Sequence, residues 1–574
     1  MSRGALAAGL VVAAYVACLR RYGIFEPVDE GLLLVQAWRT AHGEMPYVDF
    51  HTGYGPLYFR LQSLLVAAGG LAAVRWMLVA THAVGAALLY ALARRVSGPA
   101  LAAVAVAVEV AFFLPVAPAR GAPFNAPYPG WYAGVAGVAV AVLLTRPRGV
   151  RVAAAGVVCG LVFAIKPNSG ILLAAGAATA IALDARPTLV SRATLALVAL
   201  GAVVLVAPTG ATVAALALVP PVIALVALGG RDERPAGATL ALLAATFATT
   251  ALVAFAPTLA ALGLGRFSRD VLLVGANVGH LYAVPFPWTA VLAAAVGLAA
   301  FGDRGRHPRA AAAAALGVVA VTVAGAAVDA DPGAGAIRRA AETAGLVAVP
   351  LVAWGAVARL RRTRDAALVA PTAIAVVGAL QLYPRPDFIH LMALGALVLP
   401  LALHLWRGVG LPRIAVLALP LALAAGRFVP TATTVSHVLT GAVVDVDLGT
   451  ARLVVEPEGS LPLRDLAAAA SAVRALAPEE SVLVFPACGM VPFLAGRRPA
   501  GPHDYFYPGR PTRDEVAALV ARFAAAPPPL AVTCAAAGTP LAAAWDAYPE
   551  MVTLLRTRYA ERAAYPPYTI LERR

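Results

Sequence analysis

Residues 237–263 read GATLALLAATFATTALVAFAPTLAALG, which is 27 residues without a charged side chain. A helix needs about 20 predominantly apolar residues to cross the hydrocarbon core of a bilayer. Comparable apolar runs recur from the N-terminus to about residue 429, and short loops that contain arginine separate them. The pattern predicts a mainly α-helical, polytopic bundle of membrane-spanning helices.

The composition of the whole chain supports this interpretation. Of 574 residues, 61% are hydrophobic and only 13% are charged, and the mean hydropathy is +0.80. Soluble domains carry roughly 25% charged residues, so the composition excludes an ordinary soluble enzyme, a disordered protein and a fibrous one. The net charge of +15 is dispersed over many loops, and we therefore expect no nucleic-acid partner.

The distribution of basic residues predicts the orientation. Seven short loops hold eighteen arginines, whereas the six short loops of opposite sidedness hold seven basic residues. Basic residues gather in cytoplasmic loops, which predicts about 13–15 spans with the N-terminus inside and the C-terminus outside. The predicted spans are 4–19, 76–93, 99–117, 130–144, 152–165, 170–184, 193–207, 211–229, 237–263, 285–301, 310–328, 343–358, 366–383, 389–406 and 413–429.

Two segments depart from the pattern of short loops, namely the first external loop, 20–75, and the C-terminal segment, 431–574. The C-terminal segment has the composition of a small soluble domain. Strands are predicted at 442–444, 481–485 and 530–534, with an amphipathic helix at 512–525 that begins after an N-capping threonine. The chain is therefore predicted to have a transmembrane domain, 1–430, and an extracytoplasmic α/β domain, 431–574.

Two of the four cysteines lie in this C-terminal segment. Cys488 follows the strand at 481–485, and Cys534 ends the strand at 530–534. If the strands are neighbours, the two sulfur atoms meet and form a disulfide in an oxidising compartment, the alternative being two buried free thiols. The cysteine spacing is not that of metal ligands, so no zinc or iron–sulfur site is predicted from it.

The first external loop carries a concentration of acids near the membrane. Asp29 and Glu30 are adjacent, and Asp49 follows about twenty residues later. Anionic lipid headgroups would repel these side chains, whereas a carboxylate held near the bilayer serves as a general base when burial and neighbours set its pKa. Alternatively, the pair caps the helix that starts at Gly31, because acids favour a helix N-terminus. The two roles are compatible.

The same loop resembles a known family. Asp29-Glu30-Gly31, then GEMPYVDF at 43–50 and Tyr54-Gly55-Pro56, is similar to the first external loop of the GT-C superfamily of integral membrane glycosyltransferases. The similarity is to the branch of the protein O-mannosyltransferases and the aminoarabinose transferases of lipid A. The resemblance implies many spans, a carboxylate in the first external loop, a polyprenyl-phosphate sugar donor used on the outer face, and a soluble C-terminal domain.

Two shorter motifs extend the resemblance. The sole lysine, Lys166, begins a Lys-Pro-x-x-Gly turn similar to one in this branch, and it would hold the donor phosphate as a point charge. Residues 383–391, YPRPDFIHL, resemble a Pro-Arg-x-Asp-x-x-His-Leu segment, in which Arg385 would pair with phosphate and His390 would donate a hydrogen bond to it. The alternatives are a lysine that reaches lipid headgroups and an exposed Arg385–Asp387 pair of little energetic weight.

These observations predict a glycosyltransferase of the cell (cytoplasmic) membrane that moves a sugar from a polyprenyl-phosphate donor to a glycan, lipid or protein acceptor on the outer face. The second external loop, 117–130, lacks the acid that several relatives carry, so a divalent metal is left open and no ligand is assigned. The alternatives are a transporter or flippase of lipid-linked intermediates, with a midplane site around the intramembrane acid Glu109, and an inert assembly protein. The predicted catalytic residues are Asp29 and Glu30, and the predicted substrate-binding residues are Asp49, His51, Tyr54, Lys166, Arg385, Asp387 and His390.

Overall fold

The structure is a computed structural model. It describes residues 2–112, 121–206, 212–230, 235–273, 281, 286–302, 334–407, 432–476, 481–534 and 542–574. The predicted spans 310–328 and 413–429 lie outside the described residues.

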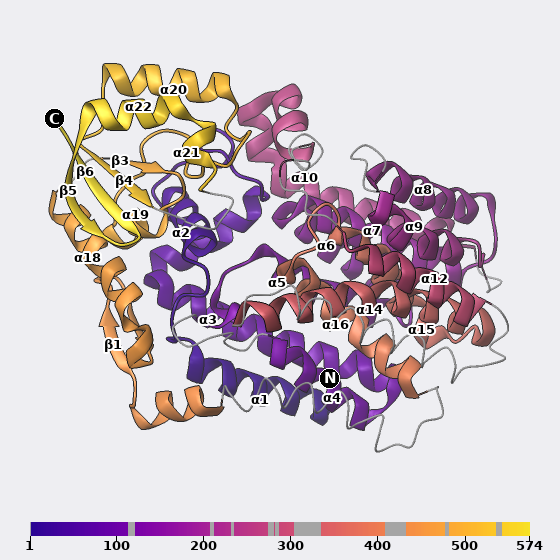
Figure 1. The fold of residues 1–574 in the computed structure, drawn as a ribbon. Helices are drawn as coiled ribbons and strands as arrows, with labels where there is room; N and C mark the ends of the chain where they lie inside the picture. The colour runs from indigo at the N-terminus through magenta and orange to yellow at the C-terminus, as the bar shows by residue number, and fades with distance from the viewer. Residues whose placement is uncertain are drawn as a thin grey trace.

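Helices dominate the chain up to residue 407 (Figure 1). The first three are α1 (Arg3–Leu19), which precedes the first external loop, α2 (Pro27–Ala41), which lies within it, and α3 (Pro56–Ser97), which begins within it. The elements that follow are α4 (Pro99–Phe112), η1 (Pro123–Asn125), α5 (Pro129–Leu144), α6 (Gly149–Ile165), α7 (Pro167–Asp184), α8 (Leu189–Val206), α9 (Thr212–Val226), α10 (Gly237–Phe267), η3 (Ser268–Leu272), α12 (Trp288–Gly302), α14 (Ala334–Thr363), α15 (Ala366–Gly378), η5 (Ala379–Leu382) and α16 (Phe388–Arg407).

Several of these helices are long and apolar enough to cross a membrane. Among the described residues, four candidate spans have 18 residues or more, and they lie in Pro56–Ser97, Leu189–Val206, Gly237–Leu272 and Ile389–Arg407. Shorter apolar helices accompany them, including α1, α5 and α6. The helical, multi-pass character predicted from the sequence is therefore confirmed, whereas the orientation and the number of spans stay predictions.

The longest helix is bent. α3 is interrupted at Gly69 and Gly70, and Gly70 has a φ of +57° and a ψ of −143°, a conformation that glycine adopts readily because it lacks a Cβ. The kink separates a first arm, 56–68, which belongs to the first external loop by sequence, from the longer arm, 71–97. The predicted span at 76–93 lies inside this second arm.

The C-terminal segment contains the strands. They are β1 (Val444–Asp447), β2 (Arg452–Val455), β3 (Val482–Phe485), β4 (Leu530–Cys534), β5 (Tyr559–Tyr565) and β6 (Tyr568–Arg573). β1 and β2 form an antiparallel pair, and the other four form a sheet of order β3-β4-β6-β5 in which only β3 and β4 are parallel. The accompanying helical elements are η6 (Pro457–Gly459), α18 (Ser460–Leu476), α19 (Met490–Ala495), α20 (Arg513–Ala525), α21 (Ala544–Ala547) and α22 (Pro549–Arg558).

The predicted βαβ unit is confirmed. β3 pairs with β4 in parallel, Val482 opposite Leu530, and α20 lies between them in sequence. Thr512 and Glu515 form a complete capping box at the start of α20, as the predicted N-cap requires. A disulfide joins Cys488 to Cys534, as the end-of-strand positions had suggested. The hairpin β5–β6 was not predicted.

The C-terminal segment packs directly on α2. Gly31 of α2 and Gly489, which precedes α19, lie backbone to backbone, and a Cβ on Gly31 would collide with the backbone of Met490. One hydrophobic core runs from α1 and α3 through α2 into α18, α19, β4 and β6. In Figure 1 the yellow strands and helices accordingly lie beside α2, with the upper end of α10 next to them.

Candidate functional site

The first turn of α2 holds the adjacent acids Asp29 and Glu30, and their side chains point to different places. Glu26 precedes the helix and Pro27 occupies its first position, where a missing N–H costs nothing. The hydroxyl of Tyr128, just before α5, donates a hydrogen bond of 2.9 Å to Asp29 Oδ2. Asp29 is partly exposed, so its carboxylate is oriented and still accessible.

Glu30 instead points into the protein. Its Oε1 accepts hydrogen bonds from the backbone N–H of Phe25 at 2.5 Å and of Glu26 at 3.2 Å, and its Oε2 lies 3.6 Å from Arg75. Burial raises the pKa of Glu30, and the Arg75 charge and the two backbone hydrogen bonds offset this only in part. Glu30 therefore braces the chain that enters α2. The helix begins at Pro27 and not at Gly31 as predicted, so both acids lie in its first turn. We retain Asp29 alone as the candidate base.

The structure places the other residues of loop one at separate sites. Asp49 is exposed, and its carboxylate accepts a hydrogen bond of 2.7 Å from the N–H of Met45, which closes a turn. The ring of His51 stacks on His503 of the C-terminal segment. Of these loop-one residues, Tyr54 lies within electrostatic range of Arg385, which precedes α16.

Lys166 occupies the turn between α6 and α7. The backbone N–H of Gly55 donates to the carbonyl of Ile165 at 2.9 Å, and a Cβ on Gly55 would collide with the carbonyl of Ala164. This close approach, which only glycine permits, fastens loop one onto the lysine turn. Lys166 is 7% exposed, and its ammonium lies within electrostatic range of Asp387.

Arg385, Asp387 and His390 form a compact group at the start of α16. Asp387 Oδ2 forms an ion pair with Arg385 Nε at 2.7 Å, and Asp387 Oδ1 lies 2.7 Å from His390 Nδ1 and accepts from the His390 N–H at 3.0 Å. Burial raises the pKa of Asp387, but His390 and then Arg385 lower it well below the ordinary value. Asp387 is thus an ionised residue that orients the side chains of Arg385 and His390.

Electrostatic interactions connect these groups into one site. Burial lowers the pKa of Arg385, but Asp387, Asp29, Tyr505 and Tyr54 together raise it above its ordinary value. Burial lowers the pKa of Lys166 to about 8, opposed by Asp387.

Lys166 in turn lies within electrostatic range of His390. The site therefore combines one oriented carboxylate with two cations and a histidine, drawn from α2, the α6–α7 turn and α16.

Sequence reasoning missed two residues of this site. The position of Tyr128 could have been noticed in the sequence, because it directly precedes Pro129-Gly130 at the start of α5, on the predicted outer side where the other motifs also lie. Burial raises the pKa of Tyr128 well above its ordinary value, and the charge of Asp29 adds to the effect, so the phenol stays protonated and donates. Tyr505 had no signal, since nothing in the chain relates it to Arg385, 120 residues earlier.

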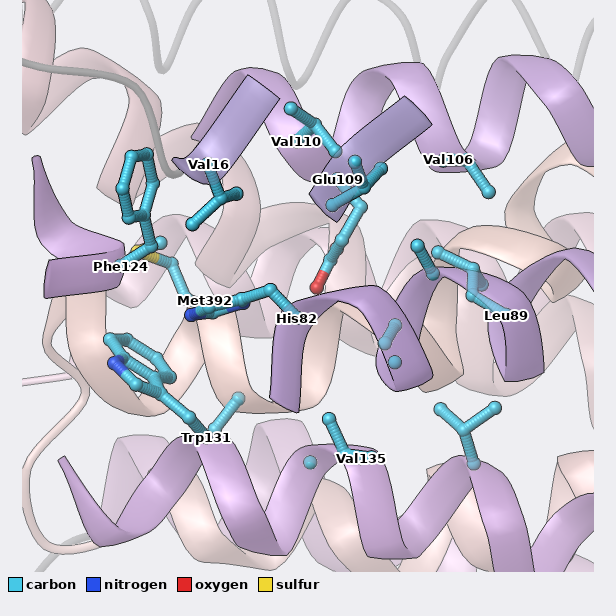
Figure 2. A pocket seen from close by; sticks show the side chains of 17 residues that line it. Val16, His82, Leu89, Val106, Glu109, Val110, Phe124, Trp131, Val135 and Met392 are labelled. Carbon is cyan, nitrogen blue, oxygen red and sulfur yellow. The ribbon is translucent and has the colours of Figure 1, made fainter. Parts of the chain in front are cut away.

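Glu109 lies apart from the site. It extends from α4 into a cavity of about 50 Å³ that α1, α3, α5 and α16 also line (Figure 2). The walls are apolar except for Glu109 and His82, and Gly395 of α16 leaves room for the carboxyl group. One water needs about 10–15 Å³ of such space, so the cavity has room for a few waters and not for a lipid-linked sugar.

Comparisons with known proteins give similarity at the level of structure. No protein-family model matches the sequence, and a search of curated proteins finds no match. The oligosaccharyltransferase of Archaeoglobus fulgidus, solved with Zn and sulfate, is 14% identical with a TM-score of 0.43, over 92% of this chain and 68% of that one. AglB from the same organism, in complex with an inhibitory peptide and a dolichol-phosphate, has the same identity and TM-score over 97% and 72%.

ArnT from Cupriavidus metallidurans, bound to undecaprenyl phosphate, is 14% identical with a TM-score of 0.35, over 100% of this chain and 98% of that one. The oligosaccharyltransferase and ArnT are GT-C glycosyltransferases, the superfamily that the loop-one motif resembles. All three TM-scores lie below 0.5. The function proposed below therefore rests on the side chains of this chain.

Proposed function

We propose that the chain transfers a sugar from a polyprenyl-phosphate donor to a cell-envelope acceptor. One observation carries this proposal: a buried lysine and an arginine whose side chain is half-exposed both lie within electrostatic range of Asp387, and the arginine also lies within range of the oriented carboxylate of Asp29. Lysine and arginine are the usual ligands of phosphate. The carboxylate supplies the base that an attacking hydroxyl needs.

The proposed reaction is a direct displacement at the anomeric carbon. Asp29 takes the proton of the acceptor hydroxyl while its oxygen forms the new bond to the sugar. The bond from the anomeric carbon to the phosphate oxygen breaks, and polyprenyl phosphate leaves with the electron pair. Lys166 and Arg385 stabilise the charge that develops on this leaving group, His390 donates a hydrogen bond to it, and single displacement inverts the anomeric configuration.

The location of the site fits a lipid donor. Lys166, Arg385 and Tyr128 all lie at the ends of apolar helices, α6, α16 and α5, where a phosphate headgroup resides while its isoprenoid chain remains in the bilayer. The disulfide Cys488–Cys534 supports an oxidising, extracytoplasmic position for the C-terminal segment. The acceptor is a glycan, lipid or protein of the envelope.

The proposal is tested in a strain that lacks the gene. We expect sugar-loaded polyprenyl phosphate to accumulate on the outer face of the membrane and one sugar to disappear from an envelope acceptor, both measured by mass spectrometry. Re-expression of the wild-type chain restores the sugar, and Asp29→Asn does not. Loaded lipid that accumulates only on the inner face would instead favour a flippase, and an unchanged lipid pool and envelope would contradict both.

Donor binding is expected to weaken above pH 8. Burial lowers the pKa of Lys166 to about 8, so the ammonium that binds phosphate is lost as the pH rises through this value. The protonated fraction falls about fivefold between pH 8 and pH 9, and the KM for the donor should rise by the same factor. In Lys166→Arg the charge persists, so a pH dependence equal to that of the wild type would refute this role.

Glu109→Gln is expected to leave sugar transfer within about threefold of the wild type, less than 1 kcal/mol of barrier. The reason is that Glu109 faces a cavity too small for substrate, and an amide of the same shape retains its packing. The measurement is the initial transfer rate of the purified variant in bilayers. If the substitution abolished function, a site around Glu109 would gain support and with it the transporter.

A further inference from the structure

A second cluster of polar side chains lies where loop one meets the C-terminal segment. His51 of loop one, His503 and Glu515 each offer a ligand atom, and these three atoms lie within 4.8 Å of one another. The two imidazole rings are stacked, with centroids 4.4 Å apart and planes inclined by 6°. His503 is buried, whereas His51 and Glu515 keep part of their surface open to solvent.

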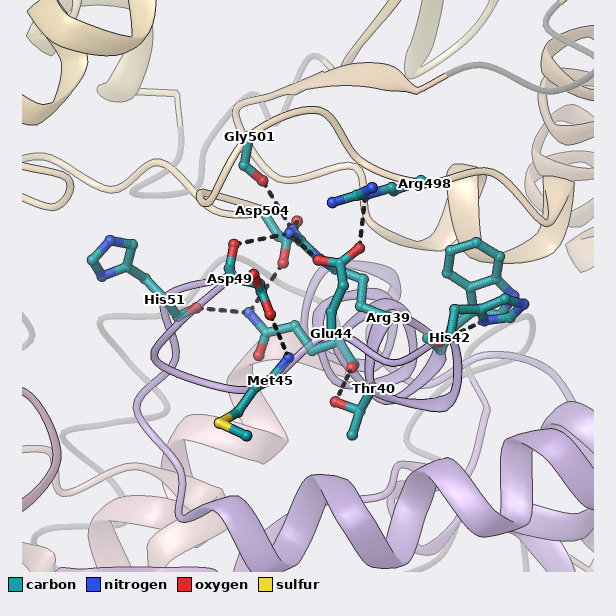
Figure 3. A network of polar contacts seen from close by, with 12 residues as sticks. Arg39, Thr40, His42, Glu44, Met45, Asp49, His51, Arg498, Gly501 and Asp504 are labelled. Carbon is teal, nitrogen blue, oxygen red and sulfur yellow. Dashed lines mark hydrogen bonds and ion pairs between the residues drawn. The ribbon is translucent and has the colours of Figure 1, made fainter. Parts of the chain in front are cut away.

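Backbone contacts fix both loops that carry the histidines. The N–H of His51 donates to the carbonyl of Pro502 at 2.8 Å, and its carbonyl accepts from Gln36 Nε2 at 2.9 Å. Arg39 then joins α2 to Asp504, the residue after His503, and to the carbonyl of Gly501 (Figure 3). The histidines are therefore held side by side by their backbones, before any ligand is considered.

The three side chains keep donor atoms available to a cation. In the described part of the chain, no side-chain nitrogen of His51 or His503 has a hydrogen-bond partner, and the hydrogen bonds of Glu515 use Oε2, which accepts from the N–H and hydroxyl of Thr512.

We propose that His51, His503 and Glu515 bind a divalent metal ion of the zinc class, with water completing the coordination. Two nitrogens and a carboxylate oxygen are a ligand set that Zn²⁺ accepts. Zn–N bonds of about 2.0–2.1 Å hold two nitrogens about 3.4 Å apart, and a metal lies in the plane of each imidazole that binds it. Binding therefore requires the two parallel rings to tilt toward a common point. Glu515 and Asp270 supply negative charge near His51, and Arg510 and Arg266 supply positive charge that partly offsets it.

The ion would join two segments that reach the candidate active site. Tyr54 follows His51 by three residues and Tyr505 follows His503 by two, and both tyrosines act on Arg385. A metal between the histidines would fix these two segments relative to each other. Metal binding itself does not depend on the sugar-transfer proposal, and its test has its own readout.

The test uses the full chain in lipid nanodiscs, purified without a polyhistidine tag and stripped with EDTA. After equilibration with Zn²⁺ and removal of free metal, elemental analysis should find one zinc per wild-type chain, and Co²⁺ should give the visible absorption of a tetrahedral site. Glu515→Gln keeps the capping box, because glutamine serves there as well. It should nevertheless weaken zinc binding about tenfold or more, and His503→Gln should abolish it.

Matched controls come from the same regions. Asp514→Asn changes the neighbouring acid of α20, and His42→Gln removes an exposed histidine of loop one, so both should still bind one zinc. Failure of the wild-type chain to bind zinc would overturn the proposal. Equal zinc binding by Glu515→Gln, His503→Gln and the wild type would overturn it as well, since the ion would then lie elsewhere.

Discussion

Asp29→Asn is expected to lower kcat for sugar transfer by about 10²–10⁴-fold, the range of a lost general base, with little change in the KM for the donor. The amide keeps the size of the carboxylate and can still accept from Tyr128, so the geometry of the first turn of α2 should persist. What it loses is the capacity to take a proton. The measurement is the release of polyprenyl phosphate from a labelled donor by purified protein in bilayers.

Glu30→Gln is the matched control, because it makes the same chemical change one residue later. Glu30 is buried against Arg75 and two backbone N–H groups, so this variant should lose stability and retain kcat per folded molecule. The opposite pattern, with Glu30→Gln inactive and Asp29→Asn active, would assign the base to Glu30. Undiminished transfer by Asp29→Asn would remove Asp29 from the mechanism.

Arg39→Met is expected to destabilise the attachment of the C-terminal segment by about 3–5 kcal/mol, the cost of leaving buried charges without their partner. Arg39 pairs with Asp504 at 2.7 Å and with Glu44 at 2.5 Å, and it donates to the carbonyls of Gly501 and Asp49 (Figure 3). Burial already raises the pKa of Asp504 even with Arg39 present. The measurement is protease sensitivity of the C-terminal segment with temperature.

Arg498→Met tests the same network from its exposed end. Arg498 contacts Glu44 at 2.7 Å, but its side chain is 61% exposed, and exposed pairs contribute about 1 kcal/mol or less. We therefore expect near wild-type protease resistance from this variant. Similar losses in the two arginine variants would show that removal of any charge from the network, and not burial, sets the effect.

Much of the fold follows from sequence patterns. The apolar run at 237–263 lies in α10, and the threonine predicted to cap the helix at 512–525 does cap α20. These features depend on neighbours in the chain, which a sequence displays directly. The β5–β6 hairpin escaped prediction because β5 is mostly exposed and charged or polar residues interrupt both strands, so they lack the continuous apolar runs that marked β3 and β4.

The site was predictable in its residue types and not in its geometry. Lys166, Arg385 and His390 were predicted to bind substrate, and this role stays a prediction. In the structure all three lie within electrostatic range of Asp387, and Arg385 also lies within range of Asp29. The different directions of Asp29 and Glu30 could not be foreseen, because adjacent helix positions differ by about 100° and the packing of α2 decides which one faces inward. His51 was predicted to bind substrate, and this stays a prediction, while its stacking on His503 was not foreseen.

The contact of Gly31 with Met490 has a consequence for how the chain unfolds. A single hydrophobic core passes from the bundle through α2 into the C-terminal sheet, so the boundary at residue 430 marks a change of composition rather than a break in cooperativity. A separately expressed 431–574 segment would expose the apolar face that α19 presents to α2. Because α2 packs on this segment, we expect any force or ligand that displaces it to loosen the helix that holds Asp29.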